Sequence, residues 1–136
     1  IASTLAAKIY DLEIIKSNVE DESGNITRFL IMGKDSQHPR QKKDKKYITS
    51  CIFKLKSIPA ALYKALGGFA TNGVNLCKLE SFAVKNSFDQ VQFYIEIEGH
   101  IENLSLQKAL EELGFHTQHL DILGVYEADK FRFKNK

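Results

Sequence analysis

Histidine and cysteine are the residues of this sequence best suited to bind a metal or to act as a nucleophile. His116 and His119 lie three positions apart in a predicted strand. Residues an odd number apart on a strand point to opposite faces, so these two imidazoles cannot share an ion without distortion. His38 and His100 fall in predicted loops. We therefore expect neither a metal site nor a cofactor.

The two cysteines, Cys51 and Cys77, both lie in predicted strands. Thiols stay unpaired in a reducing compartment, and free cysteine is among the most buried residue types. A disulfide is the alternative. We predict two buried free thiols.

A further candidate for chemistry is the run Thr27-Arg28-Phe29. Arginine suits a substrate with carboxylates, because its planar guanidinium donates two parallel hydrogen bonds to one carboxylate. Residues 26–32 are apolar on both faces, the pattern of a covered interior strand. On a regular strand Thr27 and Arg28 point to opposite faces, so both reach one cleft only if the strand ends or bulges there. Taken alone, the run is typical of a structural strand.

Residues 35–46 are polar and carry Pro39 with five basic residues. Such a run can bind nucleic acid, but this one has no interleaved aromatic residues to stack on bases, and Asp44 interrupts it. The run is typical of a linker or an exposed loop between two packed units, and we predict a solvated linker.

Composition is that of a globular protein, with 43% hydrophobic and 26% charged residues among 136. No apolar run approaches the roughly eighteen residues needed to cross a bilayer, and a net charge of +2 is too small to imply a polyanionic partner. No signal peptide is visible, although the chain begins at Ile1 and looks cut from something longer. We expect a cytoplasmic protein that binds neither membrane nor nucleic acid.

Residues 47–126 show the order strand, helix, strand, strand, helix, strand. Alternating apolar residues predict strands over residues 47–56 and 91–98, and two more from Val74 onward and over 115–126. Apolar residues at helical spacing predict one helix behind Pro59 that ends at Asn72-Gly73, and a second that ends at Gly114.

The remaining segments are assigned by local pattern. They are a helix over Ala2–Tyr10, a short strand over Leu12–Ile15, a turn at Asn86-Ser87 and a disordered or loosely attached tail over Asp129–Lys136. RNA-binding domains share the order of elements found in residues 47–126, but residues 87–94 lack the basic residue and the glycine that such a domain needs on its third strand.

The segment Lys54–Val84 resembles the first half of an ACT domain, a small-molecule-sensing module of amino-acid biosynthetic enzymes. Within that superfamily it is most similar to the regulatory domain of prephenate dehydratase. The matching motifs are Pro59-Ala60-Ala61-Leu62 for Pro-Gly-Ala-Leu, Gly73-Val74-Asn75-Leu76 for Gly-Ile-Asn-Leu, Glu80-Ser81 for the start of Glu-Ser-Arg-Pro, and Leu123-Gly124-Val125-Tyr126 for Leu-Gly-Ser-Tyr. The resemblance implies an α+β, ferredoxin-like βαββαβ fold.

The first part of the chain resembles the end of the catalytic domain of the same family. Ala6-Ala7-Lys8-Ile9-Tyr10-Asp11-Leu12 resembles Ala-Ala-x-x-Tyr-Gly-Leu, with Asp11 in place of the glycine, and Asn25-Ile26-Thr27-Arg28-Phe29 resembles Asn-x-Thr-Arg-Phe. The reaction implied is conversion of prephenate to phenylpyruvate, carbon dioxide and water. The catalytic residues implied are Thr27, Arg28 and Phe29. A threonine hydroxyl is too weak an acid to give up its proton, so its implied role is to donate a hydrogen bond to the departing oxygen.

The resemblance also implies an effector site for L-phenylalanine. The residues implied are Ala60, Ala61, Leu62, Asn75, Leu76, Glu80 and Ser81. Amides at a helix start suit an amino-acid carboxylate, although Leu62 and Leu76 also fit a plain core role. Because Ala60 replaces a glycine and Phe82-Ala83 replaces Arg-Pro, sensitivity to phenylalanine is expected to be reduced or lost.

Together these patterns predict a C-terminal fragment of a prephenate dehydratase. Residues 1–34 would end an α/β, periplasmic-binding-protein-like catalytic domain, 35–46 a linker, 47–128 the ACT domain and 129–136 a tail. We expect a homodimer through the ACT domain, with a tetramer as the larger alternative. The fragment alone should be inactive, because it supplies one wall of a cleft. The alternative is a free-standing ACT-like module that binds an amino acid or dimerises without catalysis.

Overall fold

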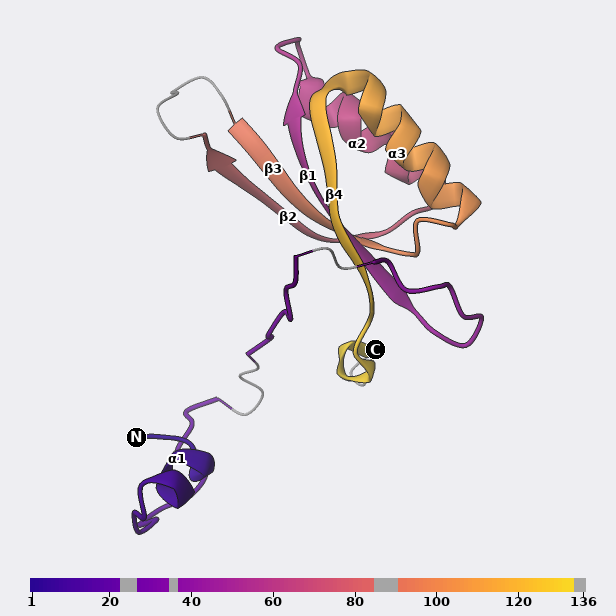
Figure 1. Cartoon of the computed structure of the whole chain (residues 1–136). Coiled ribbons are helices and arrows are strands. Elements are labelled where there is room, and N and C mark those ends of the chain that lie inside the picture. The colour runs from indigo at the N-terminus through magenta and orange to yellow at the C-terminus, as the bar shows by residue number, and fades with distance from the viewer. Residues whose placement is uncertain (23–26, 35–36, 85–90, 134–136) are drawn as a thin grey trace. The chain divides into compact units, whose positions relative to one another are not determined.

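The computed structural model describes residues 1–22, 27–34, 37–84 and 91–133 (Figure 1). Contacts within the chain divide it into an N-terminal unit, residues 1–33, and a C-terminal unit, residues 34–136. The turn predicted at Asn86-Ser87 lies outside the described residues. None of the helices in these ranges has the length and apolar character required to span a membrane.

The N-terminal unit contains α1 (Thr4–Ile9), which confirms the helix predicted over Ala2–Tyr10. Ser3 caps its start, since the Ser3 Oγ accepts a hydrogen bond from the amide of Ala6 at 3.1 Å. Just beyond its end, Asp11 has a φ of 50°. Aspartate tolerates this left-handed conformation better than most residues. The turn therefore accepts aspartate where the resembling motif has glycine.

The two strands predicted in this unit are wrong, because neither residues 12–15 nor residues 27–32 form a strand. A strand needs a neighbouring strand to satisfy its backbone hydrogen bonds. No described residue of the N-terminal unit lies in a β-strand. The apolar side chains of Phe29, Ile31 and Met32 are 85%, 103% and 88% exposed. The described part of the N-terminal unit thus leaves them uncovered.

The C-terminal unit consists of a four-stranded sheet and two helices. In chain order they are β1 (Tyr47–Leu55), α2 (Ala61–Thr71), β2 (Leu76–Ala83), β3 (Val91–Glu98), α3 (Leu104–His116) and β4 (Thr117–Glu127), followed by a 3-10 turn, η1 (Lys130–Phe133). The strands pair antiparallel in the order β2-β3-β1-β4. This is a ferredoxin-like α+β arrangement, which confirms the fold predicted from residues 47–126.

Both helices cover one face of the sheet (Figure 1). On this face the register places Cys51 opposite Ile95 and Phe53 opposite Phe93, and the two phenylalanine rings stack 5.3 Å apart. The buried core consists of Cys51, Phe53, Ala65, Phe69, Ile95, Ile97, Leu106, Ala109 and Leu113. Fully burying one large apolar side chain contributes about 1.5–3 kcal/mol, so this layer is the main source of stability in the unit.

The face away from the helices carries a buried ion pair. Glu96 alternates with core residues of β3 and so points away from the helices, yet it is only 1% exposed. Arg132 of η1 places its Nη2 3.0 Å from Oε2 of Glu96, and the Tyr94 hydroxyl donates to Oε1 at 2.8 Å. A buried carboxylate is stable only when it is paired, and Arg132 is the residue that pairs with Glu96. The prediction of a loose tail is therefore wrong for residues 129–133.

The helix ends match the sequence pattern only in part. α2 ends as predicted, with Gly73 at a φ of 64°. α3 runs past Gly114 to His116, so His116 lies on a helix rather than on a strand. His119 of β4 has its Nε2 2.6 Å from Oδ2 of Asp121. Within the described ranges no group of three potential metal ligands occurs.

α2 and α3 approach each other at Gly68. A Cβ added to Gly68 would lie 2.7 Å from the Cβ of Glu112. The Glu112 carboxylate accepts hydrogen bonds from Asn72 Nδ2 at 2.9 Å and from Thr71 Oγ1 at 3.4 Å. Glycine at position 68 therefore permits a contact that ties the end of α2 to α3.

α2 begins after a strained residue. Ala60 precedes it with φ 55° and ψ 32°, which is left-handed, and makes no side-chain capping bond. This conformation costs an L-residue about 1–2 kcal/mol, whereas glycine adopts it freely.

We expect Gly68→Ala to lower the free energy of unfolding by about 1–3 kcal/mol, because the added methyl group overpacks the helix contact. Gly67→Ala is the matched control. A Cβ there meets nothing within 4 Å, and alanine favours the helix by up to about 1 kcal/mol. Urea denaturation measures both variants, and equal stabilities would contradict the close contact at Gly68.

Ala60→Gly should raise the free energy of unfolding by up to about 1 kcal/mol. Relief of the left-handed strain outweighs the larger entropy of glycine in the unfolded chain. Ala70→Gly, at an exposed position inside α2, should instead lower it by about 1 kcal/mol. Denaturation curves that shift in the same direction for both variants would show that Ala60 is not left-handed.

Candidate functional site

The first group of predicted effector residues lies where β1 turns into α2. The Ala61 amide donates to the Ile58 carbonyl at 3.2 Å, and the Ala60 carbonyl accepts from the Lys64 amide at 3.0 Å. Leu62 is partly buried against the core. The Ala61 amide is thus already used within the turn.

The second group lies on and before β2. The Asn75 carbonyl accepts from the Glu98 amide at 2.9 Å, and Leu76 packs against the core. Glu80 and Ser81 are exposed further along the strand, and the Glu80 carboxylate lies 3.0 Å from Lys78 Nζ. Leu76, like Leu62, therefore contacts the core.

α2 separates these two groups. Ala60–Leu62 lie at its start, whereas Asn75 and Leu76 follow its end. Its eleven residues rise by about 16 Å. One copy of the chain therefore does not bring the groups together.

The predicted catalytic residues belong to the N-terminal unit. Thr27, Arg28 and Phe29 are consecutive and all exposed. Because they are not in a strand, the alternation of a strand does not force Thr27 and Arg28 to opposite sides.

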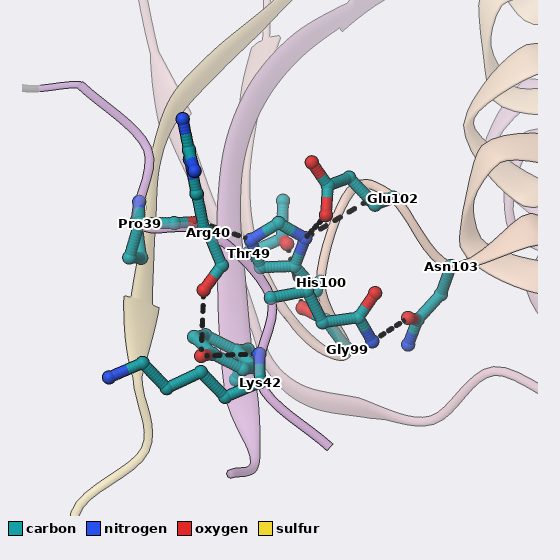
Figure 2. Close-up of polar contacts among 10 residues, drawn as sticks. Pro39, Arg40, Lys42, Thr49, Gly99, His100, Glu102 and Asn103 are labelled. Carbon is teal, nitrogen blue, oxygen red and sulfur yellow. Dashed lines mark hydrogen bonds and ion pairs between the residues drawn. The ribbon is translucent and has the colours of Figure 1, made fainter.

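Sequence reasoning missed a polar cluster at the start of the C-terminal unit. The predicted linker is exposed over residues 37–44, but several of residues 39–45 also hydrogen-bond to the sheet and its loops, which the sequence did not predict (Figure 2). A pocket of about 290 Å³ lies beside them. It is lined by Gln41, Lys45, Lys46, Tyr47, Ile48, Glu98, Gly99, His100 and Asn103.

His100 lies at the centre of this cluster and is only 1% exposed. Its Nε2 is 2.7 Å from the carbonyl oxygen of Pro39. A carbonyl can only accept, so Nε2 carries the proton. Nδ1 in turn accepts from the Glu102 amide at 3.2 Å, and the Glu102 carboxylate lies 3.7 Å away (Figure 2). The ring is a neutral imidazole with both nitrogens engaged.

Tyr47 of β1 holds the same segment. Its ring meets His100 edge-on, with centroids 4.8 Å apart and planes at 77°. Its hydroxyl donates to the Arg40 carbonyl at 3.2 Å and accepts from the Lys42 amide at 3.1 Å. A single phenol oxygen therefore ties two linker residues to the central sheet.

Two further side chains of the linker are bonded nearby. Gln41 donates to the Asn103 side chain at the start of α3. Lys45 pairs with Glu127 at the end of β4, and this hydrogen bond raises the pKa of the Lys45 amine. No pattern in the sequence distinguishes a buried loop histidine from an exposed one, which explains why the cluster was missed.

The loop that carries His100 is fixed to β1. Gly99 has a φ of 140°, a conformation that favours glycine. Its amide donates to the Tyr47 carbonyl at 2.8 Å, and its carbonyl accepts from Thr49 Oγ1 at 2.8 Å. The position of the imidazole is therefore set by the sheet.

Both cysteines are free thiols, as predicted. Burial raises the pKa of Cys51 to about 12, so its thiol stays protonated and unreactive near neutral pH. Cys77 is exposed, which corrects the prediction of two buried thiols. It sits at a register irregularity of the edge strand β2, where less of the chain covers it.

Comparison with known proteins covers nearly the whole chain. The family model described as prephenate dehydratase matches residues 1–37. The bifunctional N-acyl-homoserine lactone acylase/prephenate dehydratase of Komagataeibacter europaeus is 45% identical over 98% of this chain and 47% of its own length. Further relatives bear prephenate dehydratase or arogenate dehydratase names. The chain spans between about a third and a half of the length of these curated relatives.

Solved structures agree with this relationship. GqqA, described as a novel type of quorum quenching acylase, has a TM-score of 0.67 at 42% identity over 74% of this chain and 51% of its own. The prephenate dehydratase of Arthrobacter aurescens, solved in complex with L-phenylalanine, has a TM-score of 0.59 at 26% identity over 68% of this chain and 30% of its own. The chain thus matches the C-terminal part of the prephenate dehydratase family.

Proposed function

We propose that this chain acts as the C-terminal part of a prephenate dehydratase, which converts prephenate to phenylpyruvate, carbon dioxide and water. The observation that carries the proposal is the similarity to proteins of that name along 93–98% of the chain. Residues 1–34 would end the catalytic domain, residues 35–46 link it to an ACT regulatory domain at 47–128, and residues 129–136 form a tail. We expect the protein in the cytoplasm.

In this proposal Thr27 assists the leaving group. Formation of the aromatic ring drives the reaction, so the protein mainly has to help hydroxide depart. The Thr27 hydroxyl donates a hydrogen bond to the departing oxygen and stabilises the charge that develops there. The Arg28 guanidinium binds a carboxylate of the dicarboxylate substrate through two parallel bonds. We assign Phe29 to the same motif without a separate chemical step.

The exposed apolar side chains of the N-terminal unit support this reading. Phe29, Ile31 and Met32 are almost fully exposed, and apolar surface in water is unfavourable by about 25 cal/mol per Å². We expect a further part of the protein to cover this surface and to supply the opposite wall of the cleft. The 136 residues alone are then expected to leave prephenate unchanged.

The catalytic assignment is tested in the intact enzyme with Thr27→Val, which keeps the shape but removes the donor. We expect the turnover number to fall about a hundredfold or more. Thr27→Ser, which restores a hydroxyl, should recover most of the rate. Formation of phenylpyruvate is the assay, and near-normal turnover by Thr27→Val would exclude the role. Turnover by the 136-residue chain alone would exclude the incomplete cleft.

We also propose a homodimer in which α2 and β2 meet their equivalents in a second copy. β2 is an edge strand of the sheet. It carries Leu79 and Phe82, 43% and 42% exposed, and Tyr63 of α2 is 81% exposed. An uncovered edge tends to pair with another chain. A two-fold interface would bring Ala60–Leu62 of one copy towards Asn75 and Leu76 of the other, and would build the effector pockets in pairs.

L-phenylalanine is the effector we propose for these pockets. The Arthrobacter aurescens relative was solved in complex with it, and amides near a helix start suit the carboxylate of an amino acid. Ala60 and the pair Phe82-Ala83 are expected to weaken this binding, because both depart from the family motifs.

We expect sedimentation at micromolar concentration to give a dimer for the natural chain and a monomer for Leu79→Asp on the β2 edge. Leu123→Asp, on the opposite edge strand β4, is the matched control and should stay dimeric. Millimolar L-phenylalanine should raise the melting temperature of the dimer by mass action, and D-phenylalanine should not. A monomeric natural chain would refute the interface. A dimer without a thermal shift would refute the effector alone.

A further inference from the structure

We propose that His100 and Tyr47 form a latch that holds residues 39–42 of the linker on the C-terminal unit. The latch thereby sets the length of chain left between this unit and the segment Thr27–Phe29. The three bonds that define it run from His100 Nε2 to the Pro39 carbonyl and from the Tyr47 hydroxyl to the Arg40 carbonyl and the Lys42 amide (Figure 2).

Hydrogen bonds, and not apolar burial, hold this segment on the C-terminal unit. Residues 37–44 are all exposed. The side chains that bind this segment are instead buried, since His100 is 1% exposed and Tyr47 is 5% exposed. A rigid pair of side chains therefore binds an otherwise uncovered stretch of backbone, and loss of one oxygen or one nitrogen should loosen it.

The donors and acceptors of the latch match. Proline has no amide hydrogen and a fixed φ, so its carbonyl is presented with little conformational freedom. The neutral imidazole donates to that carbonyl through Nε2, while the Glu102 amide occupies Nδ1 and orients the ring. The Tyr47 hydroxyl uses its proton and a lone pair at the same time. His100 Nε2 and the Tyr47 hydroxyl thus find their hydrogen-bond partners in the linker.

Release of the latch would lengthen the tether between the two units. With the latch closed, residues 34–38 separate Gly33 from the first held residue. With it open, the separating segment grows to residues 34–40 while Gln41 stays bonded to Asn103. It grows to residues 34–44 once that exposed bond also breaks, because Lys45 is paired with Glu127. Each residue adds up to about 3.5 Å of reach, and the effective concentration of two tethered partners falls roughly as the −3/2 power of tether length. Where the proposed function holds, the latch would set how tightly the regulatory and catalytic parts are coupled.

Limited trypsin digestion of the full chain tests the latch directly, since Arg40 lies within it. Tyr47→Phe removes one oxygen and keeps the ring contact with His100. We expect cleavage after Arg40 to become about tenfold faster, because two backbone groups lose their partner. Cleavage after Lys16 in the N-terminal unit is the internal reference and should not change. The Lys42 amide should lose protection from hydrogen exchange in the same variant.

His100→Leu should accelerate the same cleavage at least as much, and His100→Gln less, because the glutamine amide can still donate to Pro39. Thr117→Val is the matched control. It removes a part-buried hydrogen bond to Gly114 beside Leu55, at the end of β1 away from Tyr47, and cleavage after Arg40 should stay within about twofold of the natural chain. If His100→Leu fails to fold, the cleavage rate of Tyr47→Phe after Arg40 is sufficient to test the latch. Cleavage of Tyr47→Phe at the natural rate would overturn the latch.

A distance measurement tests the consequence for the tether. Spin labels at Lys8→Cys and Lys108→Cys, in a Cys77→Ser background, report the separation of the two units. We expect Tyr47→Phe to broaden the distance distribution, and an unchanged distribution would overturn the role of the latch in setting tether length. Neither experiment uses substrate or effector, so failure of the latch and failure of the proposed function are distinguishable.

Discussion

The structure of the C-terminal unit depends on the central position of β1. This strand pairs with β3 on one side and with β4 on the other, and a strand in that position must satisfy two neighbours and two faces at once. On one face Cys51 and Phe53 form the core with both helices. At its first residue, Tyr47 reaches back to the linker. Strand pairing, core packing and two of the linker contacts therefore all involve one strand.

Polar groups make contacts away from the core that composition alone would not suggest. Glu96 is buried on the face opposite the helices and is paired with Arg132. His100 is buried beside the linker and bonded to Pro39. Both are polar side chains that are stable inside the protein because a distant segment supplies the partner. Residues 39–42 and 129–133, near the two ends of the C-terminal unit, are each bonded to one of these buried side chains.

A left-handed backbone conformation occurs at two positions where this sequence departs from the family motifs. Asp11 and Ala60 both stand where the motifs have glycine, and both have a positive φ near 50°. Aspartate accommodates this conformation through its short polar side chain, whereas alanine has no such means. The same kind of substitution is therefore tolerated at the end of α1 and strained at the start of α2.

The sequence by itself determined the order βαββαβ, because periods of two and of 3.6 residues and stop signals such as Gly73 are local properties of the chain. It also determined the family through short motifs. Tertiary structure decided those features that need a partner far away in the sequence. The apolar run at residues 27–32 did not become a strand because the described part of its unit offers no strand to pair with. His100 and the linker came together because the β3–α3 loop places a donor beside Pro39. The groups at Ala60 and Asn75 lie apart because the length of α2 separates them, a distance that no motif encodes.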